Sequence, residues 1–302
     1  MADRSSVHLH RFAVLTASAT YVLLFLGGLV TSTGSGLAVP DWPLSFGQVF
    51  PAMVGGVLFE HGHRLAASTV GLLTLVLAVW VVVAEPRPGV RGLGVAMLVA
   101  VILQGVLGGV TVLYKLPLAV SVTHACLAQI FFCLSVCMAI VTGPGWGAPR
   151  APALSFDTSV AVFGQLVLGA LTRHLGAGLA IPDFPLAFGR LVPPLETTQI
   201  AVHYAHRCGA LLVTLLATAL VTTILRSEPT LRRLATLLGA LLVTQITLAM
   251  LILTTHRAVT PTTLHLVAGA GILATSVAIT LRGARLATER TAVAPVGHPV
   301  LA

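Results

Sequence analysis

The sequence Gly34-Ser-Gly-Leu-Ala-Val-Pro-Asp-Trp-Pro-Leu-Ser-Phe-Gly47 returns later in the chain as Gly176-Ala-Gly-Leu-Ala-Ile-Pro-Asp-Phe-Pro-Leu-Ala-Phe-Gly189. Ten of the fourteen positions are identical, which indicates an internal repeat of about 140 residues. Histidines repeat with these segments, because the Glu60-x-x-His63 segment corresponds to His203-x-x-His206 and His124 corresponds to His265. Each half of the chain therefore has its own pair of histidines.

The composition is that of an integral membrane protein. Hydrophobic residues make up 56% of the chain and charged residues only 9%, whereas about a quarter of the residues of soluble domains are charged. A helix needs about 20 apolar residues to cross the hydrocarbon core. Eight stretches meet that length: 11–31, 63–84, 92–113, 118–141, 156–174, 204–225, 232–254 and 261–282. The sequence predicts an all-α protein with eight transmembrane helices in two repeated four-helix bundles.

The repeat and the charged residues together predict the organisation and orientation of the chain. Eleven arginines fall on the side of the chain ends, against six basic residues on the other side, so both termini are expected in the cytoplasm and the protein in the cell membrane. The basic residues are spread over short loops, which argues for topology and lipid contacts and against nucleic-acid binding. The predicted segments are a tail (1–10), a first repeat (11–142), a linker (143–155), a second repeat (156–282) and a tail (283–302). The first span is expected to be retained, because its repeat counterpart is internal and cannot be a cleaved signal.

Four histidines are expected at one level of the membrane. The even-numbered helices all run from the outside to the inside, and each carries one of these histidines near its start: His63, His124, His206 and His265. Facing helices of a bundle commonly supply the ligands of a cofactor, and two imidazoles can hold a haem iron from both sides. The alternative is that each histidine is a hydrogen-bonding group between helices. Zinc and di-iron sites fit poorly, because they need more ligands than these pairs provide.

The two halves differ one helical turn before the first histidine. Glu60 and His203 occupy equivalent positions, so only the first half places a carboxylate on the same helix face as its histidine. A carboxylate next to a bound cofactor is a candidate proton carrier or charge stabiliser. The alternative is an ordinary ion pair with an arginine such as Arg64.

The repeated Pro-Asp-aromatic-Pro segments are expected to form ordered loops at the outer ends of the bundles. The prolines restrict the backbone and the glycines permit tight turns. Each loop is predicted to act as a lid whose aromatic residue covers an apolar ligand. The alternative is that both loops are purely structural. The lid residues are Asp41 and Trp42 in the first loop and Asp183 and Phe184 in the second. Arg173 stands where the first half has Thr31, and it suits a propionate or a loop carboxylate.

These residues together resemble the haem A synthase family. The resemblance rests on the Gly-Ser-Gly-Leu-x-x-Pro-Asp-Trp-Pro-Leu loop, the four histidines and the eight helices in two halves, and it covers about residues 11–282. It implies a membrane enzyme that oxidises a methyl group of haem O to a formyl group, giving haem A for terminal oxidases. It also implies that His63 and His124, with Glu60, form the site for the substrate haem. His206 and His265 would hold a haem b. Contacts to the haem propionates or to the loops would come from Arg64, Arg173 and Arg207. The implied partners are haem O, haem A, an electron donor, membrane lipid and, as a candidate, haem O synthase.

The chain departs from the family pattern at a few positions. Many bacterial members carry a cysteine pair in the first loop, where this chain has Val39 and Ser45, and Thr31 stands where an arginine is common. A non-catalytic alternative is a di-haem b cytochrome that transfers electrons or oxidises quinol, but the difference between Glu60 and His203 favours the enzyme. A transporter is disfavoured, because the repeat is direct and its helices are unbroken.

Overall fold

A computed structural model describes residues 4–143 and 154–293, so parts of the predicted tails and linker (1–3, 144–153 and 294–302) lie outside the described residues. The described chain is helical, and each of its long helices is apolar enough to cross a membrane. These helices are α1 (Arg4–Ser32), α2 (Gly56–Ala84), α3 (Pro88–Leu113), α4 (Leu118–Thr142), α5 (Leu154–His174), α6 (Thr198–Ser227), α7 (Arg232–Thr254) and α8 (Val259–Val293), with the short 3₁₀ helices η1 (Ala177–Leu179) and η2 (Pro229–Leu231). The predicted all-α, eight-span protein is confirmed.

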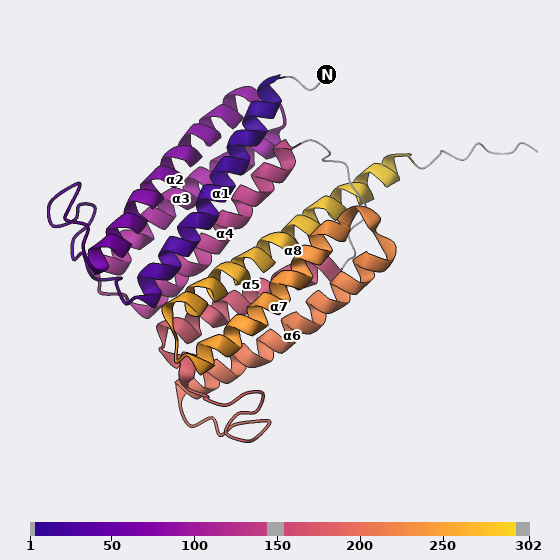
Figure 1. Cartoon of the computed structure of the whole chain (residues 1–302). Helices are drawn as coiled ribbons and strands as arrows, with labels where there is room; N and C mark the ends of the chain where they lie inside the picture. The colour runs from indigo at the N-terminus through magenta and orange to yellow at the C-terminus, as the bar shows by residue number, and fades with distance from the viewer. Residues whose placement is uncertain (1–3, 144–153, 294–302) are drawn as a thin grey trace, which may run out of the picture.

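The helices pack as two groups of four that lie side by side (Figure 1). In the first group α1 contacts α2, α2 contacts α3, α3 contacts α4, and α4 closes the ring on α1. The second group repeats this order with α5, α6, α7 and α8. The helices α2 and α4 are therefore diagonal partners across the first group, and α6 and α8 are diagonal partners across the second.

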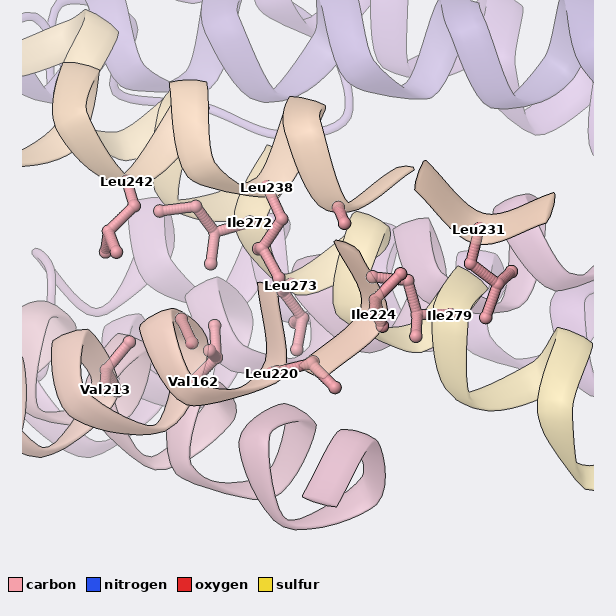
Figure 2. Close-up of a cluster of buried hydrophobic side chains, with 12 residues drawn as sticks. Val162, Val213, Leu220, Ile224, Leu231, Leu238, Leu242, Ile272, Leu273 and Ile279 are labelled. Carbon is pink, nitrogen blue, oxygen red and sulfur yellow. The ribbon is translucent and has the colours of Figure 1, made fainter. Parts of the chain in front are cut away.

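Apolar side chains fill each group and the seam between them. Figure 2 shows the core of the second group, where Leu220 and Ile224 of α6 lie close to Leu238 of α7 and Ile279 of α8. The seam is formed by α1 and α4 on one side and by α5 and α8 on the other. There Tyr21 stacks on Phe132 with 5.3 Å between ring centroids, and its hydroxyl donates to the Val267 carbonyl at 3.0 Å. The helix α8 is the most enclosed, because it packs against helices of both groups.

Several helices begin earlier than hydropathy predicts, and three of them, α1, α2 and α6, do so by six or seven residues. The helix α2 starts at Gly56 and α6 at Thr198, about two turns before the predicted spans at 63 and 204. In α6 the Thr197 side chain caps the start by accepting from the Ile200 N–H at 3.2 Å. The reason for the difference in α2 is that Glu60, which ends an apolar stretch in the sequence, has its charge neutralised inside the fold.

The loops after α1 and α5 lie at the same end of the molecule, opposite the start of α1 and the end of α8 (Figure 1). This end also carries the starts of the even-numbered helices. The assignment of this end to the outside of the membrane, and of the chain ends to the cytoplasm, stays a prediction of the arginine bias.

Candidate functional site

The four histidines lie on the diagonal helices, one on each. His63 of α2 and His124 of α4 belong to the first group, and His206 of α6 and His265 of α8 to the second. Each is six to eight residues from the first residue of its helix, which corresponds to a depth of roughly 9–12 Å at 1.5 Å per residue. The spans predicted to start at 63 and 204 therefore place His63 and His206 too close to the ends of their helices. The matched depth on diagonal helices is the feature that matters, because it leaves the centre of each bundle between two imidazoles.

Small residues on neighbouring helices make room for these imidazole rings. A Cβ atom added to Gly27 of α1 would lie 3.0 Å from Cε1 of His63, and one added to Gly169 of α5 would lie 3.2 Å from Cε1 of His206. Gly108 of α3 has the same relation to His124 at 3.2 Å. Since these contacts are tighter than ordinary packing, a larger side chain would displace the ring.

Three of the four rings also contact a glutamine of an adjacent helix. The Gln165 amide nitrogen lies 3.0 Å from Nδ1 of His206 and donates to the His206 carbonyl at 2.8 Å. The side-chain amide nitrogen of Gln245 lies 3.1 Å from Nε2 of His265, and the backbone carbonyl oxygen of Gln245 lies 3.2 Å from Nδ1 of the same ring. The side-chain amide nitrogen of Gln104 lies 3.3 Å from Nε2 of His124 and donates to the His124 backbone carbonyl at 3.1 Å. Each glutamine stands one turn before a small residue of its own helix: Gln104 before Gly108, Gln165 before Gly169 and Gln245 before Ala249.

The donor set fits a haem better than a bare metal ion. Within the described residues no three or more His, Cys, Asp or Glu side chains gather in a way that could hold a metal ion. Each bundle instead offers one imidazole from each of two diagonal helices, at matched depth. Buried ring nitrogens of His63 and His124 have no partner among the described groups. Two donors on opposite sides are what an iron needs when a porphyrin supplies its other four ligands.

Glu60 and Arg64 tie the first loop to α2. Glu60 is buried; its Oε2 accepts from the Val39 N–H at 2.8 Å and its Oε1 from Nη2 of Arg64 at 2.6 Å. Arg64 also donates to the carbonyls of Asp41 at 2.8 Å and Leu44 at 3.0 Å. The carboxylate is thus an anchor for the loop as well as the partner of an arginine.

The second half reproduces this anchor without a carboxylate. The Ile181 N–H lies 3.2 Å from Nδ1 of His203, and Nε of Arg207 lies 3.3 Å from Nε2 of the same ring; because a neutral imidazole has one acceptor nitrogen, the ring accepts from one of these two groups at a time. Arg207 also reaches the carbonyls of Asp183 at 2.7 Å and Leu186 at 3.0 Å. Arg64 and Arg207 therefore both contact their loops, but of these two arginines only Arg64 forms an ion pair in the described part of the chain.

The two loops have the same internal hydrogen bonds. The Asp41 carboxylate accepts from the N–H groups of Phe46 at 2.7 Å and Gly47 at 2.8 Å, and Asp183 repeats this pattern at the same distances. The bonds from Gly47 and then Phe46 lower the pKa of Asp41 below its usual value, and the equivalent bonds do so for Asp183. Both carboxylates therefore stabilise their own turns.

The aromatic residues of the loops are placed differently from each other. Trp42 contacts α3, because a Cβ atom on Gly109 would lie 2.6 Å from its ring, and it is 42% exposed, whereas Phe184 is 56% exposed. Val39 and Ser45 of the first loop are both buried. The Ser45 hydroxyl lies 2.8 Å from Nδ1 of His61, so polar contacts to α2 hold this loop in place.

Arg173 contacts the end of α1 and not a loop carboxylate, and a contact of Arg173 with a haem propionate stays a prediction. Its Nη2 donates to the Gly28 carbonyl at 3.0 Å and the Ser32 hydroxyl at 2.7 Å, both at the end of α1 in the other bundle. The Thr263 hydroxyl of α8 donates to the same Ser32 at 2.9 Å. A cation at the negative end of a helix is favourable, which explains why Arg173 crosses the seam.

Sequence reasoning missed the glutamines, although a signal was available. Gln104, Gln165 and Gln245 interrupt otherwise apolar spans, where an uncharged amide still needs a hydrogen-bonding partner. Two of them stand 20 residues before a histidine of the next helix. Repetition of that spacing in both halves would have marked them.

The fold and these sites define a multi-pass helical membrane protein with two pairs of diagonal histidines, each suited to a planar metal cofactor. Residues 55–277 match the COX15-CtaA family, described as cytochrome oxidase assembly protein. The chain is 34% identical to a heme A synthase of Symbiobacterium thermophilum, over 68% of this chain and 72% of that protein. It is 32% identical to a heme A synthase of Shouchella clausii, over 69% and 73%, and 31% identical to one of Halalkalibacterium halodurans, over 70% and 75%. The chain belongs to the COX15-CtaA family.

Proposed function

We propose that this protein is a haem A synthase, which oxidises a methyl group of haem O to a formyl group. The observation that carries the proposal is the pair of diagonal histidines at matched depth in each bundle. Membership of the family, and similarity to proteins named heme A synthase over most of their length, support the same activity. The product, haem A, serves terminal oxidases.

We assign different haems to the two bundles. His206 and His265 would hold a resident haem b, and His63 and His124 would bind the substrate haem O. The bound haem iron supplies one-electron chemistry, while the chain provides ligands and a dry pocket. The asymmetry that supports this assignment is Glu60, because only the first bundle has a carboxylate one turn from its histidine.

Glu60 is proposed to stabilise charge or move a proton beside the substrate haem. Its carboxylate is buried, and one oxygen is shared with Arg64 while the other accepts from the Val39 N–H. Such a group is held in one position, which general acid and base catalysis requires. The Arg64 and Arg207 contacts keep the two loops over the helix ends where the haems would bind.

The bilayer is proposed to deliver the substrate. The four histidines lie about two turns inside the predicted outer surface, so a farnesylated haem could enter laterally from lipid in the cell membrane. Its propionates would remain near the outer face, where their charge is least costly to bury. Haem O synthase is a candidate supplier, and an electron donor completes the partners.

The direct test is haem extraction from a host that lacks its own haem A synthase. Cells expressing haem O synthase are compared with and without this protein, and haems are separated by chromatography. Haem A is expected only when both proteins are present, and it should disappear in the His124→Ala variant. An intact, membrane-inserted protein that produces no haem A would refute the proposal.

A further inference from the structure

The two repeated loops each end in an apolar, outward-facing segment. We name residues 46–54 and 188–195 the loop tips. In the first tip Phe50 is 76% exposed, and in the second tip Leu191 is 83% exposed. The other exposed apolar side chains are those of Phe46, Val49, Met53 and Val54 in the first tip and of Phe188, Val192 and Leu195 in the second. Contiguous apolar surface of this kind marks a contact with a partner or with a membrane.

The two tips share an apolar character but not the shapes of their side chains. Both begin with Phe-Gly and keep a proline at the same place, Pro51 or Pro193. The equivalent positions that differ are Val49 and Leu191, Phe50 and Val192, and Met53 and Leu195. A protein interface requires complementary shape, whereas a bilayer surface requires only apolar area. The repeat therefore favours lipid as the occupant.

The loops lie beside the helices that follow them and do not lengthen the bundles. Arg64, eight residues after the start of α2, donates to the carbonyl of Leu44 at 3.0 Å. Tyr204, six residues after the start of α6, donates to the carbonyl of Leu191 at 3.1 Å. At 1.5 Å per residue, these contacts lie about 9–12 Å from the helix starts, close to where the apolar spans were predicted to begin. The tips are thus level with the predicted edge of the hydrocarbon.

The positions of the loops expose both tips to the surrounding bilayer. Figure 1 shows the first loop turned aside past α2 and the second past α6, on opposite sides of the molecule. Next to the first tip, Leu58 and Leu65 of α2 are also exposed, so the apolar surface of the tip continues into the surface that this helix presents to lipid. The segment 42–59 contains no charged residue. Nothing in that segment therefore opposes contact with lipid by its charge.

The turn that carries each tip satisfies its own polar backbone groups. Ser45 and Gln48 exchange two backbone hydrogen bonds, at 2.9 and 3.0 Å, and Ala187 and Arg190 do the same at 2.8 and 3.1 Å. The Asp41 carboxylate accepts two further N–H groups of the first turn. Since polar groups are costly to move out of water only when they lack partners, such a turn can approach lipid at little cost.

We propose that the loop tips bind the bilayer, with their apolar side chains inserted between the lipid headgroups beside α2 and α6. Apolar faces of interfacial segments reach about 5–10 Å into the boundary between headgroups and acyl chains. Two such anchors on opposite sides fix the depth and tilt of the protein. At this depth the tips still react with water-soluble reagents from their own side of the membrane, but more slowly than groups in water. The inference does not depend on which haems the bundles bind.

The test measures the depth of each tip in a bilayer that contains no other protein. Full-length, cysteine-free protein carrying Phe50→Cys or Val192→Cys is labelled with an environment-sensitive fluorophore and placed in lipid nanodiscs, one copy in each. Both probes should emit to the blue of the dye in water and resist quenching by iodide. Nitroxides on the headgroup or upper acyl chain should quench them more than nitroxides at the chain ends.

The matched control is Ala258→Cys, in the turn between α7 and α8 at the same end of the molecule. This position is exposed, and the turn carries His256 and Arg257 in place of an apolar tip. Its probe should emit as in water and be quenched by iodide. Equal shielding at all three positions would overturn the inference, because that result would place the whole end of the molecule in lipid.

A polar variant of one tip tests the cause of the shielding. Val49→Ser, Met53→Ser and Val54→Ser, added to Phe50→Cys, should raise iodide quenching toward that of the Ala258 probe. The same changes should leave the Val192 probe unaltered, which also shows that the protein is folded. Unchanged shielding at Phe50 would overturn the inference. Probes that are open to iodide in nanodiscs but shielded in cell membranes would identify a protein partner and also overturn it.

Discussion

Replacing Glu60 with histidine separates its anchoring role from its chemical role. The second half shows that histidine can accept from the loop at this position, because the Ile181 N–H donates to Nδ1 of His203 while Arg207 donates to the carbonyls of Asp183 and Leu186. Glu60→His should therefore keep the first loop attached to α2. It removes the carboxylate one turn before His63, and so it tests whether that charge is needed.

The structure sets the expected magnitudes. Glu60→Ala leaves the Val39 N–H without its acceptor, which costs about 1–3 kcal/mol. It also removes the anion from a 16% exposed Arg64, but the carbonyls of the loop still accept from that guanidinium, so the loss stays below the roughly 3–5 kcal/mol of a fully orphaned charge. The free energy of unfolding is expected to fall by about 2–4 kcal/mol in Glu60→Ala and by no more than about 1 kcal/mol in Glu60→His.

Two measurements check this prediction in the same detergent-purified proteins. Intrinsic fluorescence during heating should rank wild type and Glu60→His together, with Glu60→Ala clearly lower. Haem A extracted after co-expression with haem O synthase should fall by about 10²- to 10⁴-fold in Glu60→His and in Glu60→Gln, with haem content retained. Wild-type production of haem A by Glu60→His would show that Glu60 serves only as an anchor.

Two further outcomes are expected. Gly108→Ala should displace the His124 ring and weaken haem binding in the first bundle by about tenfold, because the new Cβ would lie 3.2 Å from that ring. The matched control is Gly105→Ala, one turn away, where the added Cβ meets no atom within 4 Å and haem binding should be normal. Equal binding in both variants, measured by haem titration, would contradict the packing argument. Cysteines placed at the exposed positions Val49 and Leu191, in a cysteine-free background, should react with an impermeant reagent only from outside the cell. Labelling from the cytoplasm would reverse the predicted topology.

The sequence was sufficient for the spans, because lipid imposes a simple rule. Every backbone polar group within the hydrocarbon must be satisfied within the segment, so a long apolar stretch is a helix regardless of its neighbours. The same rule does not fix where a helix starts. Glu60 ended an apolar stretch in the sequence, but its charge is matched by Arg64 four residues later, and α2 begins at Gly56.

The repeat and its histidines were also readable from the sequence, because nearly equal spacing in both halves gives similar depth on helices that run the same way. Only the tertiary structure decided which helices are diagonal, and thus that His63 and His124 stand on opposite sides of one bundle. It also decided that Arg173 crosses to α1 and that Gln165 fits against Gly209. The physical reason is that these contacts join residues on different helices, and a pattern along one helix records its own faces but not what packs against them.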